Sequence, residues 1–309
     1  MKVLVVGDVI VDRYTRGTKL GVSAETPTIV GKFQKEDIFV GGAGLVVRNL
    51  LRLGAEVILT TPADQSLKEL FEKSTDAPTD DEMRRFNAIK YPASTHFRIT
   101  EKRRYYVDDY KLLQFDVLNE GGWDRDSEED FCKFLDSLIE NHPLSAVVVA
   151  DNRHGTMTAK IAASVVKSCK KHGVMLYVDS QVSQNSSNHG WYEGADWFLL
   201  NMAEAGGLLR HATPDSFSRD YSKICNLLDG GIVVKMGAAG AMLYNRQGGS
   251  EFNSGYRVNA VDTCGAGDAF LAAFVIHGNL EEANKWAAIS TTYVGTVVPK
   301  IEDWEKVAR

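Results

Sequence analysis

Short apolar runs alternate with helical patterns through most of this 309-residue chain. The run Val3–Val6 is continuous and β-branched, as expected of a strand that is buried on both faces of a sheet. In the middle of the chain, helical patterns at 127–140 and 157–172 alternate with apolar runs at 146–150 and 174–178. This alternation predicts an α/β fold with a doubly wound, mostly parallel sheet. Further strands are expected at residues 56–60, 197–200, 232–235 and 242–244.

Two β-rich segments interrupt this alternation. Residues 14–40 carry short alternating runs bounded by proline and glycine, such as Thr26–Phe33. Residues 95–118 hold a second group of strand-like runs. We therefore expect both segments to form one small accessory sheet. The 44% hydrophobic content suffices for one large α/β domain or two small ones, and we predict a single domain over residues 1–309.

Composition excludes several classes of protein. The net charge of −6 gives no sign of a basic nucleic-acid-binding surface. The four cysteines show no C-x-x-C spacing, which argues against a zinc site and for reduced thiols in the cytosol. No run reaches the roughly 18 apolar residues of a membrane span, and the N-terminus is too short in apolar content for a signal peptide. We expect a cytoplasmic protein with neither membrane nor nucleic-acid partners.

The segment Val261–Asp268 places Gly265 and Gly267 directly before a long apolar run that ends at Gly278. This pattern predicts a loop that opens a buried helix. Glycine lets the backbone approach a ligand closely, and the first amides of a helix can hold an anion. Asp268 has two interpretations. It complements the helix dipole and caps the first turn, or it takes a proton from a hydroxyl that attacks a phosphoryl group held by the amides.

Polar residues recur just after predicted strands, at Asp12, Asp151, Asp179 and Asn201. In doubly wound sheets, ligands bind in the crevice beyond the carboxyl ends of the strands. We therefore expect these positions to border a binding site. For Asp12, and for the nearby Asp8, a turn cap is the simpler alternative.

Two further motifs each have a structural interpretation. Asn201 and Glu204 stand three apart at a helix start, as in a capping box, where each side chain bonds the backbone amide of the other residue. The segment Lys235–Gly240 fits a hairpin between two strands, with Lys235 as a solvated strand end.

The string Asp-Thr-Cys-Gly-Ala-Gly-Asp-Ala-Phe at 262–270 resembles the C-terminal signature of the ribokinase-type (PfkB) carbohydrate kinases. The resemblance implies a ribokinase-like fold and ATP and Mg²⁺ as cofactors, with K⁺ as a further option. It also implies that Asp268 is the catalytic base. Cys264 is the only departure from the usual signature, at a position that the family varies. The amides implied to form an anion hole are those of Gly265, Ala266 and Gly267.

The same resemblance implies roles in the first half of the chain. Asp12 matches an aspartate that binds sugar hydroxyls, a task that suits a carboxylate because it accepts two hydrogen bonds. Gly41, Gly42 and Asn49 match the second family signature and are implied sugar-site residues. Leu45 stands where the family often has asparagine, which removes one expected sugar contact. Asn49 has the alternative interpretation of a satisfied polar residue on the inner face of its helix.

For the nucleotide, the resemblance implies four residues. Asn201 and Glu204 match the Asn-x-x-Glu motif that organises Mg²⁺ and phosphate, with Glu204 acting on Mg²⁺ through water. Lys235 and Gly237 match the Lys-x-Gly-x-x-Gly loop near ATP phosphate or ribose. The accessory sheet resembles the family's lid, which often also forms a homodimer. A lid would exclude water from phosphoryl transfer.

Among these kinases, the chain is most similar to the heptose-7-phosphate kinase modules of ADP-heptose biosynthesis. Gly7–Tyr14 is similar to their opening Gly-Asp-x-Met-x-Asp-Arg-Tyr, and Val22–Pro27 to their Ile-Ser-Pro-Glu-Ala-Pro. The implied reaction transfers the γ-phosphoryl group of ATP to the anomeric hydroxyl of a phosphorylated heptose.

Two departures bear on the substrate. His154 and Gln181 stand where those kinases carry lysines that could meet a sugar phosphate. Loss of one charge-assisted contact would weaken phosphate binding by roughly 1.5–3 kcal/mol. The residues that could restore binding are Arg103, Arg104 and Arg153.

Other functions stay open. They are a kinase of another free sugar, ribokinase-like or fructokinase-like, a nucleoside kinase, and a catalytically silent sugar-binding protein on the same fold. Residues 62–92 carry no pattern to which chemistry can be attached.

Overall fold

A computed structural model describes residues 1–91, 97–182, 187–209 and 214–307. The strands of its central sheet are β1 (Lys2–Gly7), β4 (Glu56–Pro62), β5 (Phe86–Tyr91), β8 (Ala146–Asp151), β9 (Met175–Ser180), β10 (Trp197–Asn201), β11 (Gly231–Lys235), β12 (Ala241–Tyr244) and β13 (Ser250–Asn253). Their order is β13-β12-β11-β10-β9-β8-β1-β4-β5. The strands from β11 to β5 run parallel, and β12 and β13 form an antiparallel edge. The predicted α/β fold with a mostly parallel sheet is confirmed.

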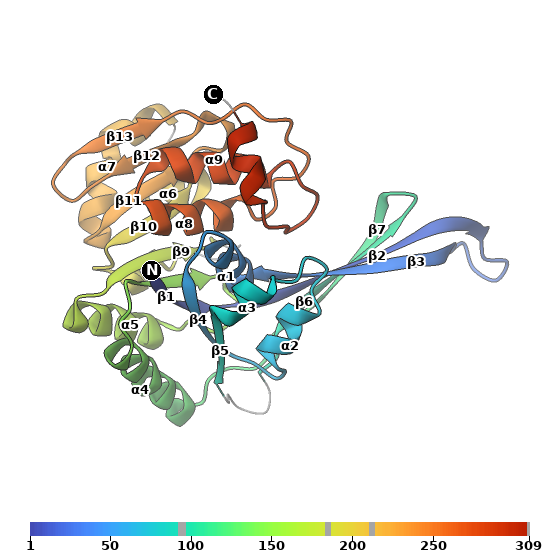
Figure 1. Cartoon of the computed structure of the whole chain (residues 1–309), viewed down its shortest axis with the longest axis horizontal. Helices are drawn as coiled ribbons and strands as arrows, with labels where there is room; N and C mark the ends of the chain where they lie inside the picture. The colour runs from blue at the N-terminus through green and yellow to red at the C-terminus, as the bar shows by residue number, and fades with distance from the viewer. Residues whose placement is uncertain (92–96, 183–186, 210–213, 308–309) are drawn as a thin grey trace.

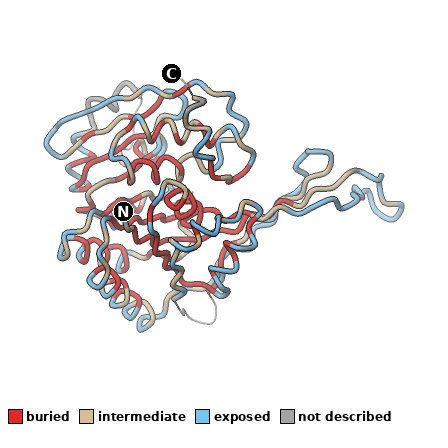
Figure 2. The backbone as a smooth tube through the Cα atoms, viewed as in Figure 1, coloured by how far each residue is buried: buried red, intermediate tan, exposed pale blue. Residues whose placement is uncertain are grey.

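Strand β1 shows why its sequence is apolar throughout. Val3 and Val5 point into a hydrophobic core on one face of the sheet, and Leu4 and Val6 point into a second core on the other face. Helices cover both faces (Figure 1), and the buried residues lie between them and the sheet (Figure 2). The first face carries α1 (Ala43–Arg52), α2 (Leu67–Glu72), α8 (Ala266–His277) and α9 (Leu280–Ser290), and the second α4 (Arg125–Asn141), α5 (Ala159–His172), α6 (Met202–Leu209) and α7 (Pro214–Leu228).

Helix α8 follows the glycine loop, as the sequence predicts. Every residue of Ala269–Val275 is buried, which explains why this helix has no polar face. The helix ends at Gly278, which adopts a left-handed conformation with φ 67°. The N-terminus of α8 is therefore held rigidly by a helix packed on all sides.

Four strands form a second sheet, which we call the accessory sheet. They are β2 (Val9–Val22), β3 (Ile29–Gly42), β6 (Thr100–Val107) and β7 (Tyr110–Val117), in the order β3-β2-β6-β7. The two β-rich segments of the sequence supply it, although β2 and β3 reach farther toward the core than expected. The sheet leaves the core as an extended arm, and its distal part is exposed (Figures 1 and 2).

Of residues 62–92, residue 92 lies outside the described residues, and the part up to Tyr91 contains α2, α3 (Asp80–Arg84) and β5. Two ion pairs tie this segment to α1, between Arg48 and Asp76 at 2.6 Å and between Arg52 and Glu82 at 2.5 Å. The role that we infer for this segment is therefore structural, because its ion pairs hold it against α1. The described residues also contain the short 3₁₀ turns η1 (His189–Tyr192), η2 (Gly237–Ala239) and η3 (Ile301–Lys306).

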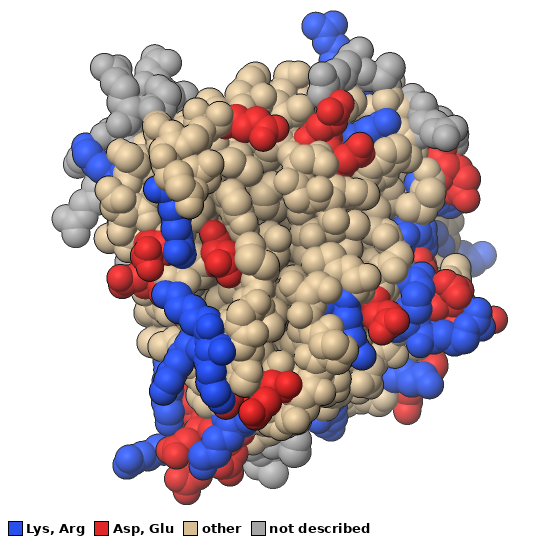
Figure 3. All heavy atoms as spheres, turned by 60° about the vertical axis from the view of Figure 1, so that its left-hand side comes forward, with Lys and Arg blue, Asp and Glu red and all other residues tan. Residues whose placement is uncertain are grey.

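On the face drawn in Figure 3, basic and acidic side chains lie interspersed, and no continuous basic surface is seen there. Within the described ranges, none of the helices combines the length and the apolar character needed to cross a bilayer.

Candidate functional site

The loop before α8 has the geometry of an anion-binding helix start. Gly265 is the N-cap of α8, with φ 81° in the left-handed region that favours glycine. A Cβ at this position would lie 2.5 Å from Cδ2 of Leu45, so there is no room for a side chain either. The amide of Ala266 makes a long hydrogen bond of 3.3 Å to the carbonyl of Thr263. First-turn amides generally have no partner inside their own helix and are available to an anion.

Asp268 lies in the first turn of α8 and is partly exposed. Burial, followed by the negative charge of Asp179, raises the pKa of Asp268 to about 7, although Lys235 lowers it. A carboxylate that only complements a helix dipole would have a lowered pKa. A general base works best when its pKa lies near the working pH. The environment of Asp268 therefore suits proton abstraction.

An ammonium group lies against this loop. The Lys235 Nζ is 2.5 Å from Oδ2 of Asp179, so the end of β11 is paired with the end of β9. A Cβ at Gly267 would lie 3.4 Å from the same Nζ, which places the ammonium beside the first turn of α8. Burial alone would lower the pKa of Lys235, but the carboxylates of Asp179 and Glu204 raise it. The lysine is therefore a fixed positive charge beside the glycine loop, not a solvated strand end.

Asn201 and Glu204 form the capping box that the sequence predicts. The Asn201 amide donates to Glu204 Oε2 at 2.7 Å, and the Glu204 amide donates to Asn201 Oδ1 at 2.9 Å. Glu204 is only 3% exposed. Burial, followed by the charge of Asp179, raises the pKa of Glu204 to about 7, against the effect of Lys235. While it caps the helix, the Glu204 carboxylate also lies close to the charges of Asp179 and Lys235.

The carboxylates around Lys235 are candidate ligands, through water, for a magnesium ion. Asp179, Glu204 and Asp268 all act electrostatically on this one ammonium. The negative charge of Asp179 contributes to the raised pKa values of Glu204 and Asp268. A hard divalent cation prefers oxygen ligands and keeps several waters, so a sparse set of carboxylates is sufficient for it.

The base of the accessory sheet adds a second ion pair. Arg104 Nη1 lies 2.5 Å from Oδ1 of Asp12, and its guanidinium lies over the ring of Tyr14 at 5.0 Å from the centroid. Asp12 is 4% exposed and its charge contributes to the raised pKa of Asp268. A Cβ at Gly41 would lie 2.8 Å from Asp12 Oδ2, so Gly41 leaves space for this carboxylate. The predicted sugar-binding aspartate and the predicted base are thus close enough to interact electrostatically.

Gly42 is required by the backbone of this region. It is the N-cap of α1 with φ 58°. A Cβ on it would lie 2.4 Å from the carbonyl oxygen of Asp8. The glycine pair is therefore explained by packing, and a direct sugar contact for Gly41 and Gly42 stays a prediction.

Gly237 also has φ 58°, in the turn between β11 and β12. This confirms the predicted hairpin, and the nucleotide contact of Gly237 stays a prediction.

Comparison with known proteins identifies the family of this chain. Residues 140–301, just over half of the 309 residues, match the family described as pfkB family carbohydrate kinase. The chain belongs to the pfkB family. The matched segment contains the ends of β9 and β11 and the starts of α6 and α8. These elements carry the four charged residues that we call the charge cluster, namely Asp179, Glu204, Lys235 and Asp268.

Curated relatives of this pfkB-family chain carry the name Bifunctional protein HldE. One from Sulfurimonas denitrificans is 25% identical over 97% of this chain and 61% of its own length. One from Campylobacter jejuni (strain RM1221) is 27% identical over 96% of this chain and 62% of its own length. The chain thus spans about three-fifths of the length of these relatives.

Solved structures show the same fold. Phosphofructokinase-2 from Escherichia coli, in complex with potassium, superimposes with a TM-score of 0.75 at 16% identity, covering 99% of this chain and 97% of that one. Arabidopsis thaliana ribokinase, complexed with ribose and ATP, has a TM-score of 0.69 at 19% identity, covering 98% and 97%. The fold is therefore ribokinase-like, as the resemblance implied.

Within this pfkB-family chain, the contacts of Asn49 favour the second of its two interpretations, and its sugar contact stays a prediction. Asn49 is 1% exposed. Its Nδ2 donates to the Leu45 carbonyl at 2.9 Å, and its Oδ1 accepts from Nε1 of Trp286 at 2.8 Å. The amide thus joins α1 to α9 inside the core. The alternative interpretation, a satisfied polar residue on the inner face, accounts for these contacts.

Arg153 lies in the loop after β8 with φ 62°. Its amide donates to Asp151 Oδ1 at 2.9 Å, and its guanidinium lies over the ring of Trp191 at 5.6 Å. Arg104, by contrast, lies at the Asp12 carboxylate. The third arginine that could restore phosphate binding, Arg103, pairs with Glu101 at 2.5 Å. Of the three, Arg104 is the one that the structure pairs with the predicted sugar-binding aspartate.

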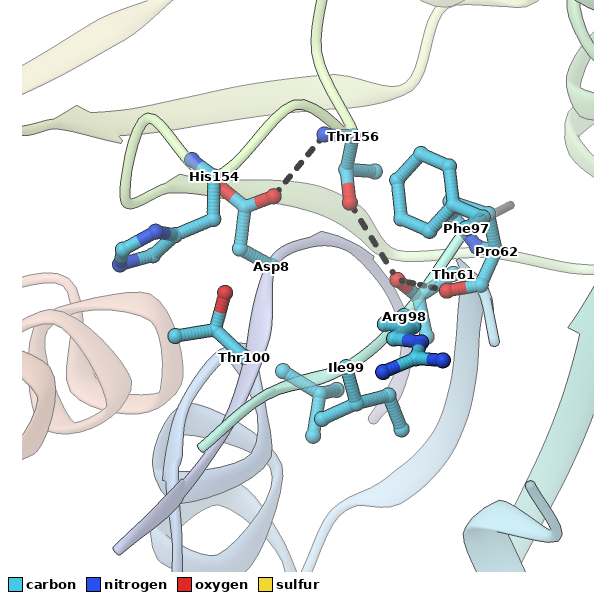
Figure 4. Close-up of a pocket in the computed structure, with 10 residues that line it drawn as sticks. Asp8, Thr61, Pro62, Phe97, Arg98, Ile99, Thr100, His154 and Thr156 are labelled. Carbon is cyan, nitrogen blue, oxygen red and sulfur yellow. Dashed lines mark hydrogen bonds between the residues drawn. The ribbon is translucent and has the colours of Figure 1, made fainter. Parts of the chain in front are cut away.

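A small cavity of about 10 Å³, with room for about one water molecule, lies beside this loop (Figure 4). Asp8 accepts hydrogen bonds there from the amides of His154 at 3.1 Å and Thr156 at 2.9 Å. Burial, followed by the charge of Asp151, raises the pKa of Asp8 to about 6. The lining residues are Asp8, Val9, Thr61, Pro62, Phe97, Arg98, Ile99, Thr100, His154 and Thr156.

The sequence analysis missed the contacts of two aspartates. Asp179 was expected only at the border of a site, yet it is the partner of Lys235. Asp8 was considered only as a turn cap, yet it organises the loop that carries His154. The signal available for both was their position directly after a buried strand. Asp151 shares that position, but it accepts hydrogen bonds in a buried network from Ser180, Asn188 and Tyr192.

Proposed function

We propose that this pfkB-family protein transfers the γ-phosphoryl group of ATP to a sugar hydroxyl. The observation that carries the proposal is the position of Asp268. This carboxylate, with a pKa raised to about 7 by burial, lies in the first turn of a helix whose glycine loop has the Lys235 ammonium beside it. Phosphoryl transfer to an alcohol requires a base for the hydroxyl proton and a site that stabilises the negative charge of the phosphoryl oxygens. The start of α8 offers both in one place.

In this mechanism, the Asp268 carboxylate takes the proton of the attacking sugar hydroxyl. The amides of Gly265–Gly267 and the ammonium of Lys235 stabilise charge on the transferring phosphoryl oxygens. Asp12 accepts hydrogen bonds from sugar hydroxyls and holds the acceptor in place. Mg²⁺, when bound, neutralises phosphate charge. Glu204 and Asp179 are the residues that would hold it through water.

We propose the anomeric hydroxyl of a heptose 7-phosphate, or of a related sugar, as the acceptor. The similarity of Gly7–Tyr14 and Val22–Pro27 to heptose-7-phosphate kinases supports it. The Arg104–Asp12 pair also supports it, because a carboxylate suits hydroxyls and a guanidinium suits a phosphate. The replacements His154 and Gln181 favour the alternative of another sugar, free or phosphorylated, or of a nucleoside.

ADP release across free sugars, sugar phosphates and nucleosides tests these proposals, with and without K⁺. We expect turnover with a sugar phosphate that is lost in Asp268→Asn and kept in Asp126→Asn, a surface control in the first turn of α4. Turnover in Asp268→Asn within a few fold of the wild type would remove the assigned base. Sugar binding without ADP release would indicate a silent sugar-binding protein.

We also propose that the protein is cytoplasmic and forms a homodimer through the accessory sheet. Free thiols at Cys132, Cys169, Cys225 and Cys264 support a reducing compartment. Exposed apolar side chains on the arm, among them Leu20, Phe33 and Phe115, support an interface there.

A further inference from the structure

A cluster of three potential metal ligands lies far from the charge cluster of the kinase site. Asp136 and Glu140 stand one turn apart near the end of α4, and His172 is the last residue of α5. Helices α4 and α5 flank β8 in the chain and return against the direction of the parallel strands. Their C-terminal ends therefore lie at the edge of the sheet opposite to the carboxyl ends that hold Lys235 and Asp268.

The three side chains lie close enough together to share one ion. One ligand atom from each residue lies within 4.8 Å of the others. The His172 Nε2 is buried, has no hydrogen-bond partner among the described residues, and lies 3.6 Å from Asp136 Oδ1. Ser168 Oγ donates to Asp136 at 2.6 Å and so orients this carboxylate. A buried imidazole nitrogen without a partner is costly unless something fills the position.

The surrounding electrostatics favour a cation. Each helix carries partial negative charge at its C-terminal end, and two such ends meet here. The opposing group is Lys171, whose Nζ lies 3.4 Å from Asp136 Oδ2. Its side chain is 54% exposed, so it can swing into solvent at little cost.

We propose that Asp136, Glu140 and His172 form a binding site for a divalent transition metal of the Zn²⁺ type. One imidazole nitrogen and two carboxylate oxygens match the ligands that Zn²⁺ takes, with solvent in the fourth position. Bonds of about 2.0–2.2 Å place tetrahedral ligands roughly 3.3 Å apart, so the side chains have to close by about 1.5 Å at most. Glu140 is exposed and free to make that adjustment. The bound ion joins the ends of α4 and α5.

Equilibrium dialysis of the metal-free, full-length protein against Zn²⁺ tests this site. We expect the wild type to bind one equivalent more than His172→Gln and Glu140→Gln. His142→Gln is the matched control. His142 caps the same helix, with its Nδ1 2.9 Å from the Leu138 carbonyl, and this variant should bind Zn²⁺ like the wild type. Zn²⁺ should also raise the melting temperature of the wild type and of His142→Gln, but not of the other two variants.

Equal Zn²⁺ stoichiometry in the wild type and in both ligand variants would overturn the proposal and leave a simple His172–Asp136 ion pair. If His172→Gln does not fold, Glu140→Gln decides, because Glu140 is exposed. None of these readouts depends on the kinase reaction, so a failure of the proposed function would not affect them.

Discussion

The Lys235 ammonium and the Asp179 carboxylate form an ion pair that joins the ends of two strands separated by β10 in the central sheet. The pair holds one positive charge beside Gly267 while it places a negative charge near Asp268. It therefore links the anion-binding loop to the basicity of the proposed catalytic carboxylate.

Replacing Asp179 with asparagine should change the pH dependence of the reaction. The charge of Asp179 is the second cause, after burial, of the raised pKa of Asp268. Without it, the pKa of Asp268 falls from about 7, so a larger fraction of the base is ionised at low pH. In the wild type, kcat/KM should fall about tenfold per pH unit below about 7. The acid limb of Asp179→Asn should lie at lower pH, and an unchanged limb contradicts the link.

Asp268→Asn should lose activity and gain stability at pH 8. Loss of a general base costs roughly 10²–10⁴-fold in rate. Because the pKa of Asp268 is raised in the folded state, ionising it disfavours folding progressively as the pH rises from about 3.8 to about 7. The neutral amide removes that penalty. We expect about 1 kcal/mol or more of added stability at pH 8, discounted for partial exposure, and less at pH 5.5. Denaturant unfolding at both pH values measures it.

Gly265→Ala should damage both stability and turnover. The new Cβ would meet Leu45 at 2.5 Å, and φ 81° disfavours any side chain. We expect a loss of about 1–3 kcal/mol in unfolding free energy and a lower kcat. Gly190→Ala is the control, because a Cβ there meets nothing within 4 Å. If Gly265→Ala behaves like Gly190→Ala, the loop is not constrained as described.

Asn49→Leu should destabilise the protein and leave the KM for the sugar unchanged. The substitution leaves Nε1 of Trp286 buried without its acceptor, which costs about 1–3 kcal/mol. In a double-mutant cycle with Trp286→Phe, the second change should cost less in the Asn49→Leu background than in the wild type. A raised KM for the sugar with unchanged stability would support the predicted sugar contact of Asn49.

Phe33→Glu and Phe115→Glu should shift the oligomeric state toward monomer. Both side chains are exposed on the accessory sheet, and a charge there opposes burial in an interface. Phe252→Glu, on the edge strand β13, is the control for an exposed apolar residue elsewhere. Sedimentation velocity compares the variants. A wild type that stays monomeric at all concentrations contradicts the proposed dimer.

Features that depend on neighbours in the chain were the ones that could be read from the sequence. The strand–helix alternation, the glycine loop before α8 and the Asn201–Glu204 capping box all involve residues a few positions apart. Backbone sterics and helix-end hydrogen bonding decide them locally, so spacing alone predicts them.

The tertiary structure decided which distant groups meet. The Lys235–Asp179 pair, the Arg104–Asp12 pair and the Asn49–Trp286 hydrogen bond each join residues separated by at least 56 positions. No local pattern encodes such pairs, because they depend on strand order and on how α1, α8 and α9 pack. The amino-acid order by itself determined the fold class and the glycine loop that opens α8. Only the packed sheet determined the charges that set the pKa of Asp268, since burial and long-range Coulomb interactions exist only in the folded chain.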